Sequence, residues 1–137
     1  MQRTLALVKP DAYAAGHQGA IMARIQESGL RVVSFKSLHL TRAQAEGFYH
    51  VHRERPFFGD LVTFMTEGKI AAMVLEGDDA IKRWRDLMGP TDATKAAAGT
   101  IRGDFGTSIE RNASHGSDAE DTAAFEVGYF FAGLELV

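Results

Sequence analysis

The run KIAAMVLEG at residues 69–77 constrains the fold most, because every position in its middle is apolar. A run this short and this apolar predicts a strand at the centre of a sheet, covered on both faces. Three further stretches predict strands: TLALV (4–8), ended by Pro10; LRVVSFKSLHL (30–40), rich in β-branched residues; and EVGYFF (126–131). The sequence therefore predicts a four-stranded sheet with 69–77 inside it.

Helical periodicity and capping signals fill the intervals between these strands. One helix is expected over 18–29, where Gly29 ends it, and two more are expected after capping boxes at Thr41–Gln44 and Ser117–Glu120. A helix that starts at Pro56 would have an apolar side made of Phe57, Phe58, Leu61, Val62 and Met65. A helix over 78–88 would turn Ile81, Trp84 and Met88 inward. Residues 90–103 are expected to be loop-like at both ends. Without its insertions the order is βαββαβ, the α+β ferredoxin-like sandwich with a four-stranded antiparallel sheet. Residues 1–137 are expected to form a single domain.

Charge and composition exclude several classes of protein. The formal net charge of −3 argues against a broad nucleic-acid footprint, which needs clustered positive charge. Without cysteine, the chain has no disulfides and no thiolate metal sites. The N-terminal apolar run covers only Leu5–Val8, which is too short for a signal peptide or a membrane span. We therefore expect a cytoplasmic protein with no membrane partner.

One histidine stands out by its setting, the stretch RNASHGSD at residues 111–118. His115 has small and polar neighbours, with Gly116 to let the backbone approach a ligand and Ser117 expected to cap a helix. A helix N-terminus favours an anion such as phosphate, and a neutral imidazole there is able to attack phosphorus as a nucleophile. The alternative is a loop histidine whose hydrogen bonds are satisfied within the protein.

Basic side chains at the ends of predicted elements suit a polyphosphate. Lys9, Arg85 and Arg102 would supply the charge, since the arginine fork matches phosphate geometry and lysine adds a point charge. Thr91 and Asn112 would add polar contacts. The alternative for each basic residue, taken alone, is a solvated surface group.

Metal and hydrolase sites have weaker support. Asp11 and Asp118 are candidates to assist a magnesium ion, although lone acids usually serve turns or caps. A metal site at His50-x-His52 is disfavoured, because residues two apart on a helix face different directions. No G-x-S-x-G elbow, P-loop or dinucleotide-binding motif is present, so a phosphate site would rely on side chains.

Four motifs together resemble the nucleoside diphosphate kinases. They are Lys9-Pro10-Asp11, Tyr49-x-x-His52-x-x-x-Pro56-Phe57-Phe58, Gly99-Thr100-Ile101-Arg102-Gly103-Asp104-Phe105 and Asn112-x-x-His115-Gly116-Ser117-Asp118. The resemblance runs essentially from end to end of the chain, with the same motif order and similar intervals. The fold that it implies agrees with the βαββαβ order of the predicted elements.

The resemblance implies a ping-pong enzyme that moves the γ-phosphoryl group of a nucleoside triphosphate to a nucleoside diphosphate through a phosphohistidine on His115. ATP, GTP and other nucleotides would serve, with broad base tolerance. By position, the resemblance implies that the phosphates are bound by Lys9, Arg85, Thr91 and Arg102, and that Lys9 also reaches the ribose, with Asn112 near the sugar. The base would lie among Phe57, Leu61 and Ile109. Around the histidine, Glu126 and Ser117 would lie behind His115, Tyr49 would orient Lys9 and His115, and Asp118 would reach Mg²⁺ through water.

The resemblance also implies a homo-oligomer built from dimers into a tetramer or hexamer. The sequence adds that the strand at 30–40 is long and apolar, and an exposed sheet edge must be covered or paired. One departure is the loop PTDATKAAAG at 90–99, which has no internal proline where many relatives carry one or two, so we expect it to be pliable. Two other classes of protein are alternatives to the enzyme. One is a nucleotide-binding regulator without turnover. The other is a ferredoxin-like nucleic-acid-binding module, which would need a basic sheet face with exposed aromatic residues.

Overall fold

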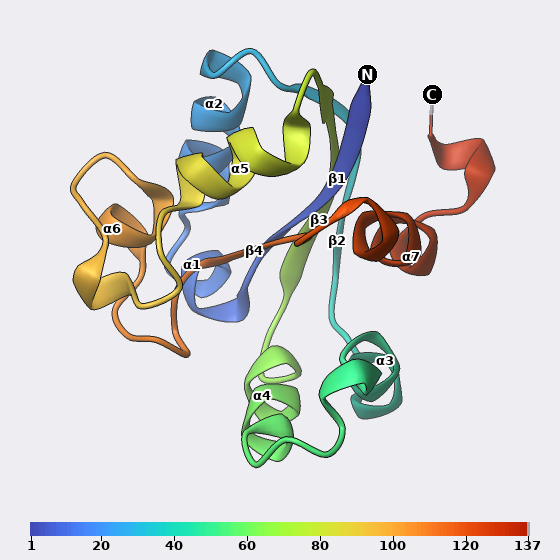
Figure 1. Cartoon of the computed structure of the whole chain (residues 1–137). Coiled ribbons are helices and arrows are strands. Elements are labelled where there is room, and N and C mark those ends of the chain that lie inside the picture. Colours follow the sequence, from blue (N-terminus) through green and yellow to red (C-terminus); the bar gives the residue numbers. More distant parts are fainter. Residues whose placement is uncertain (137) are drawn as a thin grey trace.

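The structure, a computed structural model, describes residues 1–136 and has one four-stranded antiparallel sheet at its centre (Figure 1). The strands are β1 (Gln2–Val8), β2 (Arg31–Leu38), β3 (Ile70–Gly77) and β4 (Ser114–Gly116), in the spatial order β2-β3-β1-β4. The apolar run 69–77 forms an inner strand that pairs with both β1 and β2. The βαββαβ order and the antiparallel sheet confirm the ferredoxin-like plan.

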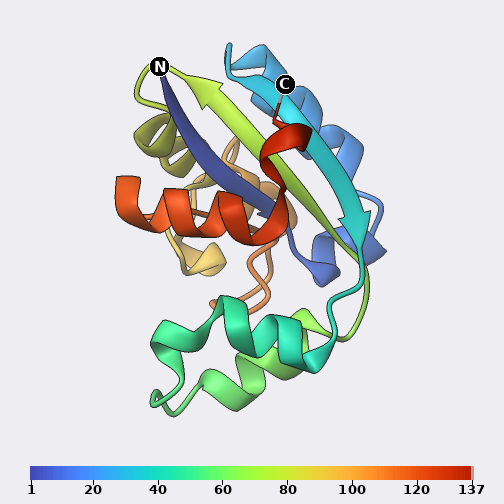
Figure 2. The same ribbon diagram turned by 90° about the vertical axis from the view of Figure 1, so that its right-hand side faces the viewer.

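Two of the helices form a hairpin inserted between the paired strands β2 and β3. They are α3 (Arg42–Phe48) and α4 (Phe58–Met65), joined through a 3₁₀ turn at His50–His52. Figure 2 shows this hairpin in green, lying beyond one end of the sheet. The expected capping box opens α3, because the Gln44 N–H donates to Thr41 Oγ1 at 3.1 Å and the Thr41 N–H donates to Gln44 Oε1 at 2.9 Å.

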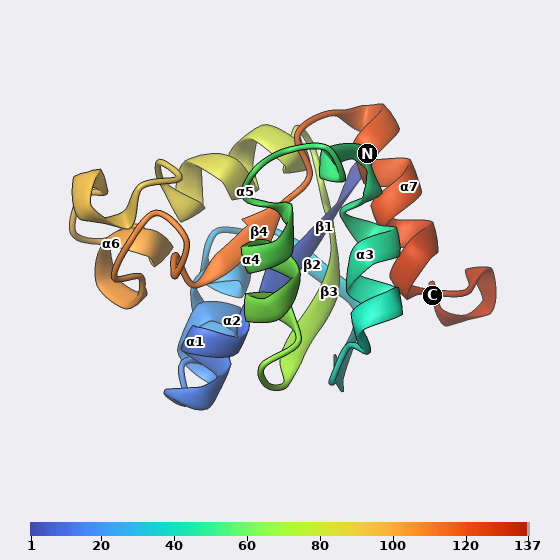
Figure 3. The same ribbon diagram turned by 90° about the horizontal axis from the view of Figure 1, so that it is seen from below.

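The remaining helices cover the sheet, which separates two cores, one on each of its faces (Figure 3). They are α1 (Pro10–Ala14), α2 (Gln18–Glu27), α5 (Ala80–Met88), α6 (Ile101–Phe105) and α7 (Glu120–Phe130), with 3₁₀ turns at Ala93–Lys95 and Gly133–Glu135. Because side chains alternate along a strand, Leu5 and Leu7 of β1 face α3, α4 and α7, whereas Ala6 and Val8 face α1, α2, α5 and α6. On α5 the expected inward residues Ile81, Trp84 and Met88 are buried.

The expected strand at 126–131 is wrong, since these residues belong mostly to helix α7. The stretch is aromatic and β-prone, but Ala123, Val127 and Phe130 recur at helical spacing and are all buried. Packing of that stripe on the sheet overrides the local propensity. The fourth strand is instead the three-residue β4 around His115, which is too short to show a strand periodicity.

The expected capping box at Ser117–Glu120 is also wrong. Helix α7 begins at Glu120, and the first-turn hydroxyl of Thr122 accepts hydrogen bonds from the N–H groups of Asp118 and Ala119, at 3.2 and 2.9 Å. The Ser117 side chain points away from that helix start and into the protein, where it is fully buried. His115 therefore lies in a strand, several residues before the helix.

Three other boundaries differ from the sequence analysis. Helix α4 begins at Phe58, because Pro56 lies in the preceding turn. Pro10, expected only to end a strand, is the first residue of the short helix α1, a position where its missing N–H costs nothing. Residues 101–103, at the end of the stretch expected to be loop-like, belong to helix α6 (Ile101–Phe105), which Thr100 caps by accepting from the Gly103 N–H at 3.0 Å.

The loop 90–99 ends in a tight turn that has the geometry for a proline. The Thr100 N–H donates to the Ala97 carbonyl at 3.2 Å, and Gly99 adopts a positive φ of 95°. A four-residue turn with a positive φ at its third position favours proline at its second, which is Ala98. Ala98 is exposed, and its N–H donates no hydrogen bond within residues 1–136.

Ala98→Pro is therefore expected to stabilise the fold by about 0.4–1 kcal/mol, because proline restricts the unfolded chain at a turn that accepts it. The melting temperature should rise by roughly 1–5 °C in thermal denaturation. Gly99→Ala tests the same turn in the opposite direction. It should lower the melting temperature, because alanine is strained at the positive φ of this position. A lower melting temperature in Ala98→Pro would contradict this account of the loop.

Candidate active site

His115 owes its direction to a register of three residue pairs. It is the middle residue of β4 and pairs with Leu7 of β1, so its side chain shares the face of Leu7, toward α3 and α7. Ser114 and Gly116 pair with Val8 and Ala6 and lie on the opposite face, toward α5. A shift of one residue in this register would turn the imidazole into the other core.

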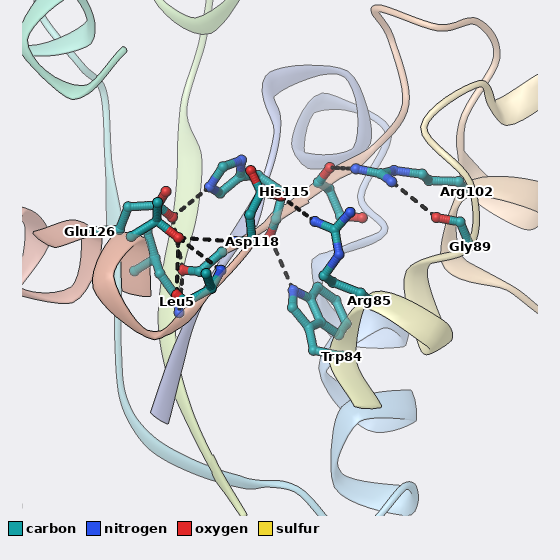
Figure 4. Close-up of polar contacts among 12 residues, drawn as sticks. Leu5, Trp84, Arg85, Gly89, Arg102, His115, Asp118 and Glu126 are labelled. Carbon is teal, nitrogen blue, oxygen red and sulfur yellow. Dashed lines mark hydrogen bonds and ion pairs between the residues drawn. The ribbon is translucent and has the colours of Figure 1, made fainter. Parts of the chain in front are cut away.

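A short series of hydrogen bonds lies behind the imidazole (Figure 4). His115 Nε2 is 2.8 Å from Glu126 Oε1, and the Ser117 hydroxyl donates to the same carboxylate oxygen at 2.9 Å. Ser117 Oγ also accepts the Leu5 N–H of β1 at 3.2 Å. The Glu126 carboxylate, which faces His115, is therefore supplied by α7 and is held through Ser117 by the backbone of the inner strand β1.

This contact distinguishes the two nitrogens of His115. In a neutral imidazole with its hydrogen on Nε2, that hydrogen donates to Glu126 and the Nδ1 lone pair stays free. The rings of Phe48 and Tyr49 meet the imidazole edge-on, at centroid distances of 5.5 and 6.3 Å. Ser117 donates to Glu126 and not to His115, so these residues do not form a hydrolase triad.

Tyr49 brings a protonated hydroxyl to the histidine. Burial, reinforced by the negative charge of Glu126, raises the pKa of Tyr49 well above its usual value. Its hydroxyl is buried and has no hydrogen-bond partner within residues 1–136. A donor in that state is available to a ligand. No hydrogen bond joins Tyr49 to Lys9, so the orienting contact that the family resemblance implied is not made directly.

Lys9 is a buried cation at the end of β1. Only 8% of the residue is exposed, and its Nζ donates to Asn112 Oδ1 at 2.9 Å. Burial, together with the positive charge of Arg102, lowers the pKa of Lys9 to about 8, while Asp11 acts in the opposite direction. A cation held at this cost gains from the arrival of an anion.

Arg102 is a second buried cation, supplied by α6. Its Nη1 donates to the Gly89 carbonyl and its Nη2 to the Ser114 carbonyl, both at 3.0 Å (Figure 4). Burial and the neighbouring Arg85 lower the pKa of Arg102 to about 10, with Asp118 acting in the opposite direction. The two carbonyl contacts fix the guanidinium beside β4 while leaving part of its donor capacity free.

Arg85 and Asp118 form an ion pair at the more open side of this group. Arg85 comes from α5 and Asp118 from the segment between β4 and α7, and both side chains are exposed. Thr91 contributes its carbonyl, which accepts from Asn112 Nδ2 at 3.0 Å. Asn112 also donates to the Ile109 carbonyl at 3.1 Å, so it holds Lys9, Thr91 and Ile109 together from a buried position.

Two large apolar side chains that the family resemblance assigns to the base are exposed. Phe57, at the start of α4, is 48% exposed, and Ile109, in the loop before β4, is 54% exposed. Leu61 lies one helical turn after Phe57 and is half-buried against the core. Exposed aromatic and aliphatic faces offer stacking surfaces without hydrogen-bonding groups.

Three supporting contacts carry no recognisable signal in the sequence. Trp84 Nε1 donates to the His115 carbonyl at 3.1 Å and so fixes β4 from the α5 side. A Cβ on Gly116 would lie 2.6 Å from atoms of Trp84 and Met88, so this glycine makes room for that packing and not for a ligand. Arg24 of α2 holds α6 by its ion pair with Asp104 at 2.6 Å.

The weaker metal-site candidates of the sequence, at His50, His52 and Asp11, have other roles in the structure. His50 and His52 lie in a 3₁₀ turn, and within residues 1–136 no group of three histidine, cysteine or acidic residues is placed to hold a metal ion. Asp11 serves the backbone, since its Oδ2 accepts the Ala113 N–H at 3.1 Å. Ala113 has a positive φ of 72°, which this contact helps to hold.

Two buried cations and a histidine with one free nitrogen, on a ferredoxin-like fold, define an enzyme of phosphoryl transfer. The family model described as "Nucleoside diphosphate kinase" matches residues 2–136. A "Nucleoside diphosphate kinase" of Syntrophotalea carbinolica is 63% identical, with all of both chains covered, and one of Desulfosudis oleivorans is 58% identical, covering 100% of this chain and 99% of its own. The chain belongs to the nucleoside diphosphate kinase family.

Solved structures agree with this assignment. The Aquifex aeolicus nucleoside diphosphate kinase has a TM-score of 0.97 and 47% identity, with 99% of each chain covered. A halophilic nucleoside diphosphate kinase from Halobacterium salinarum, solved in complex with CDP, has a TM-score of 0.95 and 44% identity, covering 99% of this chain and 91% of its own. Phosphoryl transfer between nucleotides is the role of this family, and the chain is a phosphotransferase. None of the helices within residues 1–136 is long and apolar enough to cross a membrane.

The contact with Glu126 predicts one tautomer for neutral His115, with the hydrogen on Nε2. Nitrogen NMR of the imidazole should show a protonated Nε2 and an unprotonated Nδ1. Glu126→Gln is expected to weaken this preference, because an amide is a poorer acceptor than a carboxylate. An Nδ1–H tautomer in the unaltered protein would contradict the hydrogen bonding described here.

Proposed function

We propose that the chain catalyses ping-pong transfer of the γ-phosphoryl group between nucleotides through a phosphohistidine at Nδ1 of His115. The observation that carries the proposal is the contact of Nε2 with Glu126, which leaves Nδ1 as the free ring nitrogen. In the first half-reaction the Nδ1 lone pair forms the bond to the γ-phosphorus as the bond to the diphosphate leaving group breaks. In the second, an oxygen of a different nucleoside diphosphate takes the phosphoryl group from Nδ1 and restores the histidine.

Glu126 and Ser117 act in this proposal as positioning residues. Glu126 accepts the Nε2 hydrogen and stabilises the positive charge that grows on the ring as Nδ1 attacks phosphorus. Ser117 keeps the acceptor oxygen in place through its contact with the Leu5 N–H. Tyr49, whose buried hydroxyl has no hydrogen-bond partner among residues 1–136, would donate to an oxygen of the transferred group.

The buried cations would bind the polyphosphate. Arg102 and Arg85 contact phosphate oxygens together with Thr91, and Lys9 reaches the phosphates and the ribose, with Asn112 near the sugar. Lowered pKa values at Lys9 and Arg102 support this proposal. Within residues 1–136 neither cation forms a hydrogen bond or ion pair with a carboxylate, so bound phosphate would stabilise both. Phosphoryl transfer depends mostly on such positioning and charge neutralisation.

The base would lie between apolar surfaces. Phe57 offers a ring face and Ile109 closes the other side, with Leu61 nearby. Neither Phe57 nor Ile109 has a side-chain group that distinguishes one base edge from another, which supports use of ATP, GTP and other nucleotides. The CDP complex of the Halobacterium salinarum relative supports extension of this site to pyrimidines.

Magnesium is the proposed cofactor, carried mostly by the nucleotide phosphates. The donor set fits that arrangement, because Asp118 supplies one exposed carboxylate and Mg²⁺ commonly combines one or two carboxylates with phosphates and water. Asp118 would reach the ion through water. When bound, the ion neutralises charge on the phosphates.

The proposal includes a cytoplasmic, single-domain homo-oligomer over residues 1–137, with no nucleic-acid partner. Edge strand β2 presents unpaired backbone groups along one side, and a two-fold dimer would cover such an edge symmetrically. Light scattering coupled to size exclusion should give a mass of four or six chains. A monomer mass with full activity at micromolar concentration would refute this part of the proposal.

Incubation with ATP and Mg²⁺ alone should leave one phosphoryl group on His115. Peptide mapping by mass spectrometry under mildly alkaline conditions, where phosphohistidine survives, locates it. His115→Ala is expected to fold and to incorporate no phosphate, whereas His50→Ala, at an exposed position in the 3₁₀ turn, should be labelled normally. Phosphate found only on serine in an active preparation would overturn the mechanism.

Nucleotide affinity should fall as the pH rises above about 8, the pKa of Lys9 in the free protein. Bound phosphate favours the charged amine and so raises the pKa of Lys9 in the complex. Above pH 8 the amine of the free protein is increasingly deprotonated, so it must take up a proton when the nucleotide binds, and nucleotide affinity falls. For one linked proton, nucleotide affinity falls by at most about tenfold per pH unit. Calorimetry of ADP binding at pH 8.5, in two buffers of different ionisation enthalpy, measures the uptake. If the Lys9→Met variant takes up as many protons as the unaltered protein, the proton uptake belongs to another group.

A further inference from the structure

Arg111 joins the loop before β4 to the end of helix α4. Its Nη1 and Nη2 donate to the two carboxylate oxygens of Glu67, at 3.2 and 2.9 Å, in a bidentate pair. The guanidinium carbon also lies 4.8 Å from the centre of the Phe64 ring. The hydrogen bond from Arg111 lowers the pKa of Glu67, which favours the ionised carboxylate of the pair. Arg111 is thus held both by a charge and by an aromatic face of α4.

The same residue organises the loop that carries Ile109. The Arg111 carbonyl accepts the N–H groups of Thr107 and Ser108, at 2.8 and 3.3 Å, and the Arg111 N–H donates to Ser108 Oγ at 2.9 Å. These contacts close residues 107–111 into a compact turn with Ile109 at its centre. A displacement of Arg111 would therefore displace the whole turn.

The α3–α4 hairpin carries Phe57, the other side chain proposed to bind the base. Helix α4 is eight residues long, and eight residues of α-helix span about 12 Å, with Phe57 just before its start and Glu67 just after its end. Within residues 1–136, the Arg111–Glu67 pair is the one side-chain hydrogen bond or ion pair that joins hairpin residues 42–67 to the segment 106–116. Movement of the hairpin relative to the loop would change the separation of Phe57 and Ile109.

We infer that Arg111 and Glu67 act as positioning residues that set the gap between Phe57 and Ile109, and so tune affinity for the base of a nucleotide. This inference rests on the proposed binding of the base between those two side chains. Neither Arg111 nor Glu67 contacts the reacting atoms in this role. Their effect is limited to the part of the ligand that lies in the gap, and leaves the phosphate contacts of Lys9 and Arg102 unchanged.

The expected effect is moderate. Both side chains are almost half exposed, at 46% and 43%, so water screens the pair, although bidentate geometry is the favourable case for a surface ion pair. Loss of either partner is expected to weaken ADP binding by about threefold to tenfold. A change confined to positioning raises KM and leaves kcat unchanged.

Calorimetry on the full chain, with ADP and with inorganic pyrophosphate as separate ligands, tests the inference. The variants are Arg111→Met, Glu67→Gln and their combination, with thermal denaturation to establish folding. Arg3→Met is the matched control, because Arg3 pairs with Glu76 at 2.8 Å near the end of β1 remote from Lys9. Glu67→Gln keeps the test informative if Arg111→Met does not fold.

Each single variant should lose ADP affinity and keep the affinity for pyrophosphate, and the combined variant should lose no more than one single variant, since both act through one pair. The control should match the unaltered protein. Unchanged ADP affinity, an equal loss of pyrophosphate affinity, or additive losses would overturn the inference. A loss of pyrophosphate affinity in Arg111→Met with a gain in Glu67→Gln would instead assign Arg111 a direct contact with phosphate.

Phe57→Ala separates this inference from the proposed function. Stacking on a base is worth roughly 1–3 kcal/mol, so this variant should weaken purine and pyrimidine nucleotides alike. If Phe57→Ala weakens ADP binding and the Arg111 and Glu67 variants do not, only the role of the ion pair is wrong. If Phe57→Ala also leaves ADP affinity unchanged, the proposed binding of the base is wrong as well.

Discussion

The pairing of β4 with β1 is the constraint on which the site depends. It comprises only three residue pairs, yet it sets the face on which His115 emerges and brings it to Glu126 of α7. Such a short ladder has little stability of its own, and its position is supported from both cores. Trp84 holds the His115 carbonyl on one side, and Ser117 joins β4 to the Leu5 N–H on the other. The direction of one side chain thus depends on packing across the whole sheet.

The electrostatics of the site follow from burial more than from total charge. The chain is acidic overall, but Lys9 and Arg102 lie under protein with few counter-charges, and burial lowers the pKa of both. Burying these charges destabilises the ligand-free protein, because in the described part of the chain they are compensated by polar contacts and by the charges of Asp11 and Asp118 alone. Local arrangement, which net charge does not report, makes this end of the sheet suitable for a polyanion.

Much of the fold could be predicted from the sequence, because its inner strands and α2, α3 and α5 carry strong local patterns. The run 69–77, the Thr41–Gln44 capping box and the inward face of α5 were all predicted correctly. The errors gather around the site. Residues 126–131 have the composition of a strand but lie mostly in α7, and the true fourth strand is three residues long. Local propensity cannot identify either, since tertiary packing decides both.

The site residues divide in the same way. Motif similarity selected the side chains that the structure gathers around β4, including Lys9, Arg102 and Glu126. It could not supply the atoms that meet, such as Nε2 of His115 with one oxygen of Glu126, because these depend on rotamers and on register. It also missed Trp84 and Arg111, whose contacts join residues far apart in the chain and leave no local pattern.

The α3–α4 hairpin enters and leaves between two strands that are paired with each other, β2 and β3. An insertion at such a point can change in length or sequence without altering the pairing of any strand. Phe57 and helix α4 carry one surface proposed for the base, whereas the first half of the hairpin packs against His115 through the rings of Phe48 and Tyr49. Variation after the 3₁₀ turn could accumulate over evolutionary time, and ligand preference could diverge, while the half of the hairpin that contacts the histidine stays the same.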